Sequence, residues 1–130
     1  MEVQIMSVYK IAEEALSQPF IQGTNDCNIL ALKVLDHIAG TSWVEVAKYK
    51  TLKAGYKQLK SLGYTYTIDI IKEYADEVTH AIDGDIWVSN EDNHTLALVM
   101  SDRLVRVNEN HDGFTLTRKN NDGKYYRIRK

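Results

Sequence analysis

Apolar side chains recur at helical spacing through the first eighty residues of the chain. The clearest stretch is DCNILALKVLDHIAG, residues 26–40, where they repeat every three or four residues and polar side chains take the other face. Thr24, Asn25 or Asp26 can cap the start of this helix, and Gly40 can close its end. Similar spacing predicts three more helices, at VYKIAEEAL (8–16), AGYKQLKSLG (54–63) and TIDIIKEYADEV (67–78).

After residue 83 the pattern changes to short strand-like runs, separated by turn residues at roughly ten-residue intervals. HTLALVM is apolar on both faces after Thr95, which indicates a central strand. The Asp-Gly of NNDG (120–123) predicts a hairpin between the last two runs. Helices followed by an antiparallel β-meander predict an α+β fold, with N-terminal helices packed on a C-terminal sheet. The runs are DIWVS (85–89), HTLALVM (94–100), RLVRVNE (103–109), FTLTRK (114–119) and KYYRIRK (124–130).

The length of the chain indicates its number of domains, and its net charge indicates which classes of partner to expect. A chain of 130 residues predicts one domain, spanning residues 1–130. Sixteen basic and eighteen acidic side chains give a net charge of −2, so we expect neither nucleic acid nor a membrane as a partner. No apolar run approaches the ~20 residues that span a bilayer. The stretch from Met1 to Lys10 lacks the apolar core of a secretory signal.

Cys27, the only cysteine, stands in the first turn of the predicted helix at 26–40. Unpaired backbone N–H groups and the positive end of the helix dipole favour a thiolate at this position. A free cysteine also behaves as a small buried hydrophobe, and Cys27 lies on the apolar stripe of its helix. The pattern therefore leaves two roles open for Cys27, a nucleophile or a packed core residue.

A nucleophilic thiol needs a base within reach. His94 opens the most apolar strand, and a sheet packed on the Cys27 helix would present it at the start of that helix. The alternative is a solvated residue at a strand end. His37 lies near the far end of the Cys27 helix, and His80 and His111 fall in predicted loops. His94 is therefore the candidate base.

Four segments resemble, in the same order, motifs of the NlpC/P60 family of papain-like cysteine peptidases. PFIQGTNDC (19–27) resembles the loop and Asp-Cys that begin the family's catalytic helix, and DGDIWV (83–88) resembles its Gly-Asp-apolar strand. HTLALV (94–99) resembles its histidine strand, and DRLVRVN (102–108) resembles the next strand, which carries a third polar residue. The resemblance covers roughly residues 19–108 and implies the papain-like NlpC/P60 arrangement.

The resemblance implies a thiol hydrolase that cleaves amide bonds, with peptidoglycan stem peptides as the expected substrate. Cys27 is then the nucleophile and His94 the base, and the Cys27 backbone N–H and Gln22 hold the oxyanion. No metal or cofactor is expected. The resemblance and the lack of a signal point to a bacteriophage protein, in the virion or the host cytoplasm, with virion proteins as partners.

The third catalytic residue stays open among four neighbours. Arg106 aligns most simply, but a guanidinium cannot accept a hydrogen bond from an imidazole. Asn108 fits the chemistry if the register shifts by two residues, and we favour it. A two-residue turn at SD (101–102) would instead set Glu109 across from His94, and a longer turn would favour Asn108 or Asn110.

Three departures from the family pattern support a second hypothesis. Phe20 replaces the tyrosine expected near the oxyanion, Asn28-Ile29 replaces Ser-Gly after the cysteine, and Arg106 occupies the simplest third position. They favour a catalytically inactive NlpC/P60-like structural or binding protein, such as a phage tail or host-interaction protein.

The remaining polar clusters suggest no further site. Asp85, Glu91 and Asp92 match no calcium loop and are interpreted as solvated turn carboxylates. One cysteine with scattered histidines lacks the spacing of a zinc site. The basic C-terminal run is interpreted as an edge hairpin that its charges protect from edge-to-edge pairing.

Overall fold

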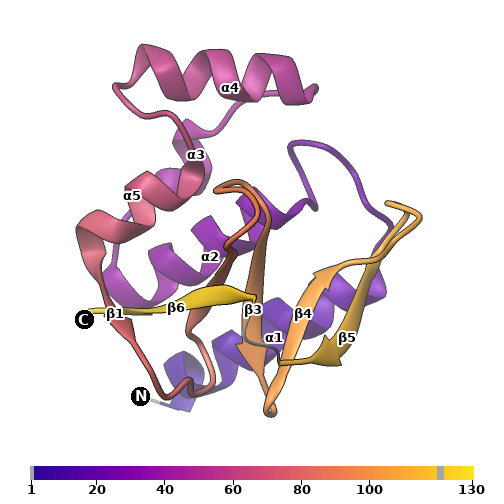
Figure 1. The fold of residues 1–130 in the computed structure, drawn as a ribbon, viewed down its shortest axis with the longest axis vertical. Helices are drawn as coiled ribbons and strands as arrows, with labels where there is room; N and C mark the ends of the chain where they lie inside the picture. The colour runs from indigo at the N-terminus through magenta and orange to yellow at the C-terminus, as the bar shows by residue number, and fades with distance from the viewer. Residues whose placement is uncertain (1, 120–121) are drawn as a thin grey trace.

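The computed structural model describes residues 2–119 and 122–130. Within these residues the chain forms five helices and then six strands (Figure 1). The α+β class and the order of helices before strands are as predicted, whereas one short helix at 43–46 and one strand at 75–78 were not predicted. The helices are α1 (Glu2–Ser17), α2 (Cys27–Ala39), α3 (Trp43–Val46), α4 (Leu52–Ser61) and α5 (Thr67–Tyr74). The strands are β1 (Ala75–Val78), β2 (Ile86–Ser89), β3 (Leu96–Met100), β4 (Arg103–Val107), β5 (Phe114–Arg118) and β6 (Gly123–Ile128).

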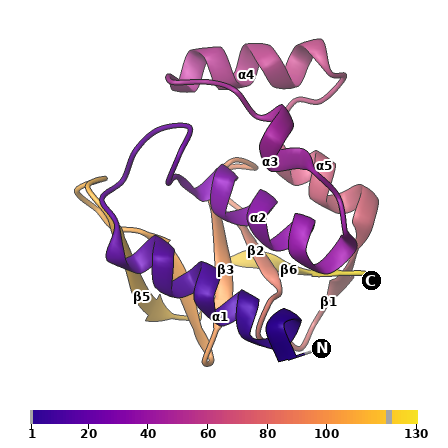
Figure 2. The ribbon, with the colours of Figure 1, turned by 180° about the vertical axis from the view of Figure 1, so that it is seen from behind.

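The described strands form one antiparallel sheet in the order β1-β6-β2-β3-β4-β5. Helices α1 and α2 cover one face of it, as the two opposite views in Figures 1 and 2 show. The main core lies in this layer, and α2 contributes five buried residues to it, Leu35 among them. A second, smaller cluster on the sheet contains Trp87, Val99 and Leu104. β3 is therefore buried on both faces, as its apolar run predicts.

Two local predictions are wrong. The predicted hairpin of the last two runs does not form, because β6 pairs with β1 and β2 instead of β5. Part of the predicted turn, residues 120–121, lies outside the described residues. The predicted helix at 67–78 ends at Tyr74, and its last four residues form β1 along β6. Both errors concern the pairing of β6 with β1 and β2, and the partner of a strand cannot be read from the pattern of residues within it.

α2 confirms its prediction almost residue for residue. Asp26 caps it, and Gly40 closes it in the left-handed region at φ 75°. α4, by contrast, buries none of its residues and lies farthest from the sheet in both ribbon views. No helix in the described part of the chain is both long and apolar enough to cross a bilayer.

Candidate functional site

Asp26 fixes the loop that leads into α2. Its side chain is 1% exposed. One carboxylate oxygen accepts the Ile29 backbone N–H at 2.8 Å, and the other accepts Gly23 N–H at 2.7 Å, Tyr49 O–H at 2.7 Å and Gln22 Nε2 at 3.0 Å. A buried carboxylate needs such partners, because its oxygens have lost their contacts with water. Asp26 therefore holds the start of α2, and the residue that follows it, in one position.

The same loop is tied to two other parts of the molecule. A Cβ on Gly23, at φ 85°, would overlap the carbonyl oxygen of Tyr49, so only glycine fits there. On the other side, Phe20 N–H donates to the carbonyl of Asp112 at 3.0 Å. The loop thus lies between the α3–α4 segment and the β4–β5 turn.

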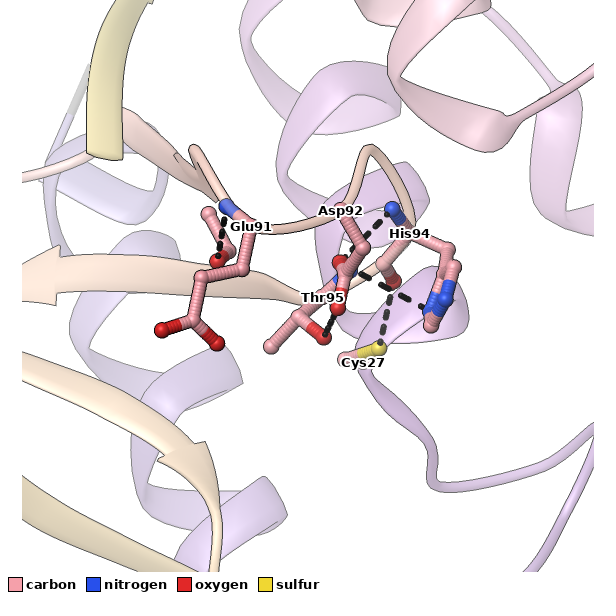
Figure 3. Close-up of polar contacts among 6 residues, drawn as sticks. Cys27, Glu91, Asp92, His94 and Thr95 are labelled. Carbon is pink, nitrogen blue, oxygen red and sulfur yellow. Dashed lines mark hydrogen bonds and ion pairs between the residues drawn. The ribbon is translucent and has the colours of Figure 1, made fainter. Parts of the chain in front are cut away.

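The thiol of Cys27 is partly buried at the start of α2. It donates to the backbone carbonyl of His94, with Sγ 3.7 Å from the oxygen (Figure 3). Burial raises the pKa of Cys27 to about 11, although the backbone N–H groups of Leu96 and of Cys27 itself point at the sulfur and lower it. The thiol is therefore protonated at neutral pH in this arrangement.

His94 lies two residues before β3, in the loop between β2 and β3, and does not open the strand as predicted. Its side chain is 48% exposed. The imidazole packs beside two tyrosine rings, with centroids 6.3 Å from Tyr56 and 6.1 Å from Tyr66. The backbone of His94, and not its ring, makes the hydrogen bond with Cys27.

Asp92 was interpreted from the sequence as a solvated turn carboxylate, and this is wrong, because it is partly buried beside the candidate base. Its Oδ1 lies 3.7 Å from His94 Nδ1 and accepts the N–H groups of His94 and Thr95 at 3.1 and 2.7 Å (Figure 3). Thr95 Oγ1 donates to Oδ2 at 3.0 Å. Burial acts to raise the pKa of Asp92, but these hydrogen bonds outweigh it and hold the pKa below its usual range. A carboxylate two residues before a histidine is the signal that could have identified it.

Cys27 and His94 line one cleft of about 560 Å³. Gln22, Asn108, Arg106 and Glu109, all named from the sequence, line the same cleft. So do Phe20 and His111, whose rings meet edge to face at 6.3 Å between centroids. The fold therefore brings together, around one cavity, residues that are up to ninety-seven positions apart in the chain, from Phe20 to Thr117.

Two of the four candidates for the third residue, Asn108 and Arg106, have other partners here. Asn108 and Asp112 exchange two hydrogen bonds across the β4–β5 turn, at 2.7 and 3.1 Å. The guanidinium of Arg106 stacks 5.1 Å from the Trp87 ring. Ser101 and Asp102 form the two-residue turn, and the register pairs Leu98 with Val105. Extended into the loop, this register sets the exposed Glu109 opposite His94; Asn110 is also exposed.

Other predicted or neighbouring groups lie away from the cleft. Asp85 was interpreted as a solvated turn carboxylate, and this is wrong, because it is 2% exposed and accepts two hydrogen bonds from Arg127 at 2.9 and 3.0 Å. His80 is exposed in the loop before β2. Among the described residues, no group of three or more His, Cys, Asp or Glu side chains is placed to hold a metal ion.

Comparison with known proteins gives one family. Neither the curated proteins nor the solved structures contain a match. A family model described as a domain of unknown function, DUF6950, matches residues 6–126, which is most of the chain and includes every residue of the cleft. The chain therefore belongs to the DUF6950 family.

Proposed function

We propose that the protein is a cysteine-dependent amide hydrolase in which Cys27 is the nucleophile and His94 transfers the proton. The observation that carries this proposal is the meeting of the α2 N-terminus and the His94 loop at one open cleft. The contact of Asp92 with His94 Nδ1 supports it, because a carboxylate there orients the ring and leaves Nε2 for the thiol. The resemblance of the same residues to NlpC/P60 peptidases is further support.

The proton leaves the thiol during attack, since the resting thiol is neutral. The exposed His94 ring turns from Tyr56 and Tyr66 toward Sγ, and Nε2 accepts the proton as sulfur bonds to the substrate carbonyl carbon. The tetrahedral intermediate then expels the amine, which takes the proton from Nε2. Water, deprotonated by His94, attacks the thioester and releases a carboxylic acid and the free thiol.

Two donors are available for the oxyanion of the intermediate. The backbone N–H of Cys27 lies in the first turn of α2, where helix N–H groups have no intrahelical acceptor. Gln22 Nε2 carries two hydrogens, and its bond to Asp26 uses one and fixes the amide at the cleft wall. Gln22 thus compensates for Phe20, which has no hydroxyl.

We infer peptidoglycan stem peptides as the substrate class, on the resemblance to NlpC/P60 peptidases. A cleft of about 560 Å³ lies in the range that holds a short peptide segment. The proposed setting is a bacteriophage virion or its host, with virion proteins as partners. The papain-like arrangement of helix and sheet is part of the same proposal.

One observation favours a second function, an inactive binding or structural protein on the same fold. The thiol proton is held by a backbone carbonyl, and burial keeps the thiol neutral. A cysteine of this kind can serve packing alone. The two functions differ in whether His94 ever activates the sulfur.

Alkylation of Cys27 by iodoacetamide at pH 7 separates the two functions. The hydrolase predicts that His94→Ala slows alkylation on the order of a hundredfold, because general-base assistance is lost. The matched control is His80→Ala, which removes an exposed histidine outside the cleft and should leave the rate unchanged. Equal, slow rates in wild type and His94→Ala would establish the inactive protein.

Release of free amines from stem peptides then tests the substrate. Wild type and His80→Ala should release amine, and Cys27→Ala and His94→Ala should not. A reactive Cys27–His94 pair without amine release would retain the thiol chemistry and reject the substrate class.

A further inference from the structure

An apolar groove separates α4 from the rest of the molecule. One wall is the face of α4 whose side chains recur every three or four residues, from Leu52 at its start to Leu62 just after its end. The opposite wall comes from α2, α3 and α5, with Leu32, Trp43, Ala47 and Ile70. Val46, Leu52 and Leu62, which all line the groove, are 40%, 50% and 44% exposed. An exposed apolar surface that is hollowed in this way is typical of a binding site.

The groove is long and thin. Because a helix rises about 1.5 Å per residue, the wall from Leu52 to Leu62 extends over about 15 Å. The volume of the groove is about 30 Å³, measured in the same way as the cleft of about 560 Å³. A branched or ring-shaped group is too wide for such a space. An unbranched chain has the shape that fits it.

The polar groups in the walls of the groove are mostly bonded within the protein. The Gln58 side chain donates to the carbonyl of Val46 at 2.6 Å and accepts the Lys48 N–H at 3.0 Å. Tyr49 O–H donates to Asp26 at 2.7 Å. A peptide carries an N–H and a C=O at almost every residue, and most of them would remain unpaired in this groove. A hydrocarbon chain has no polar groups to satisfy, so its chemistry matches the walls.

The groove is continuous with the cleft that holds Cys27. Asn28, Leu52 and Tyr56 line both the groove and the cleft. Asn28 follows Cys27 in the chain, and the centroid of the Tyr56 ring lies 6.3 Å from that of the His94 ring. A chain that lies along α4 therefore leaves the groove beside the proposed nucleophile and its base.

We propose that the groove binds the unbranched hydrocarbon chain of an acyl amide and that the amide carbonyl then lies at Cys27. The inference rests on the proposed hydrolase for its reaction and adds a substrate class to the stem peptides, namely N-acyl amines with a fatty acyl chain. Cys27 displaces the amine from the acyl carbon, and water then releases the fatty acid from the thioester. Because the chain binds through burial alone, each further methylene group in the groove should strengthen binding about fourfold.

Binding of primary amides to Cys27→Ala tests the groove without the reaction. Acetamide, butanamide, hexanamide and octanamide differ only in chain length, and calorimetric titration measures the Kd of each. Binding should strengthen roughly fifteenfold for each pair of methylene groups added. Adamantane-1-carboxamide, which is apolar but wide, and a capped dileucine, which carries peptide groups, should both bind more weakly than octanamide.

Two double variants, both made in Cys27→Ala, locate the bound chain. Val46→Gln with Leu62→Gln puts polar groups into the groove and should weaken octanamide binding at least about tenfold, with acetamide unaffected. The matched control is Ile82→Gln with Leu116→Gln, at side chains that are 50% and 48% exposed and lie outside the groove and the cleft. The control should bind octanamide as tightly as Cys27→Ala, and equal thermal midpoints should show that both double variants fold.

Three results of these titrations would overturn the proposal: equal losses in the two double variants, binding that does not depend on chain length, and a capped dileucine that binds as tightly as octanamide. Release of p-nitroaniline by wild type tests the reaction separately. Binding that depends on chain length, without hydrolysis of octanoyl p-nitroanilide, would support the groove and reject the hydrolase. Equal kcat/KM for the acetyl and octanoyl anilides would support the hydrolase and reject the groove.

Discussion

Asp92 holds the His94 loop and faces the imidazole with the same carboxylate. The backbone bonds from His94 and Thr95 fix the turn, and the 3.7 Å approach to Nδ1 places a negative charge beside the ring. These two effects can be separated by substitution. Asparagine keeps an oxygen acceptor for the N–H groups but removes the charge.

We expect Asp92→Asn to slow both alkylation of Cys27 and amide hydrolysis by about tenfold, with little loss of stability, because ring orientation depends on the charge. Asp92→Ala should also lower the free energy of unfolding by about 1–2 kcal/mol, because it leaves the loop N–H groups without an acceptor. Urea denaturation and alkylation rates measure the two effects. Glu91→Gln, an exposed neighbour, is the control. If Asp92→Asn were alkylated and hydrolysed amides at the wild-type rates, the role of Asp92 would be only to stabilise the turn.

The thiol of Cys27 makes stability depend on pH in the alkaline range. Its pKa in the folded chain is about 11, above the value near 8.5 of an unfolded cysteine. Between these values the folded state binds the proton and the unfolded state does not, so stability is complete below about pH 8.5 and falls as pH rises toward 11.

Urea denaturation at pH 7.5 and 10.5 should therefore show a larger loss of stability for wild type than for Cys27→Ser, which has no titrating thiol. Tyrosines that ionise in the same range are common to both proteins and cancel. Parallel losses would mean that the thiol has the same pKa in the folded and the unfolded chain, which contradicts its burial.

The helices α2 and α4 both begin with a side-chain cap, but the two caps differ in the number of hydrogen bonds they accept. Asp26 is buried and accepts four hydrogen bonds, one from the α2 backbone and three from the loop and Tyr49. Thr51 accepts only Ala54 N–H, at 3.1 Å, on an exposed helix. Asp26 thus connects α2 to the preceding loop and to Tyr49, whereas Thr51 stabilises only the first turn of α4.

Asp26→Ala should lower the free energy of unfolding by about 2–4 kcal/mol, because it leaves several buried donors unpaired. Thr51→Ala should cost about 1 kcal/mol or less. Urea denaturation compares them, and alkylation of Cys27 should become faster in Asp26→Ala as the thiol is uncovered. Similar costs for the two substitutions would show that the Asp26 contacts do not persist in solution.

The insertion of β6 between β1 and β2 decides the shape of the whole molecule. Tyr126 and Ile128 of β6 enter the main core. Arg127, between them, reaches back to the buried Asp85 before β2 and to the carbonyl of His80 at 2.8 Å. The C-terminal strand is thus tied to the loop between β1 and β2.

Arg127→Met should destabilise the chain by about 3 kcal/mol or more, because it leaves the carboxylate of Asp85 buried without its partner. Arg129→Met removes an exposed pair with Asp76 and should cost at most about 1 kcal/mol. Thermal and urea unfolding of both variants check the difference. A cost for Arg127→Met no greater than that for Arg129→Met would contradict a closed Asp85–Arg127 pair.

The sequence by itself determined the features that depend only on residues close together in the chain. The apolar period and the Asp26 cap were enough to place α2 with Cys27 in its first turn. Strand alternation located β2 to β6 to within two residues at most of their boundaries, and gave the order of helices before sheet. The same short segments predicted Cys27 and His94 as candidate site residues, and both line one cleft.

Only the tertiary structure decided what depends on residues far apart in the chain. The strand β1 forms because β6 lies beside it, and β6 takes that place because its two faces fill two apolar clusters and Arg127 pairs with Asp85. The thiol meets the carbonyl of His94 and not its ring, and Asp92 meets the ring, because packing of the loop on α2 sets these distances. Such contacts have no local period, so no pattern along the chain could reveal them.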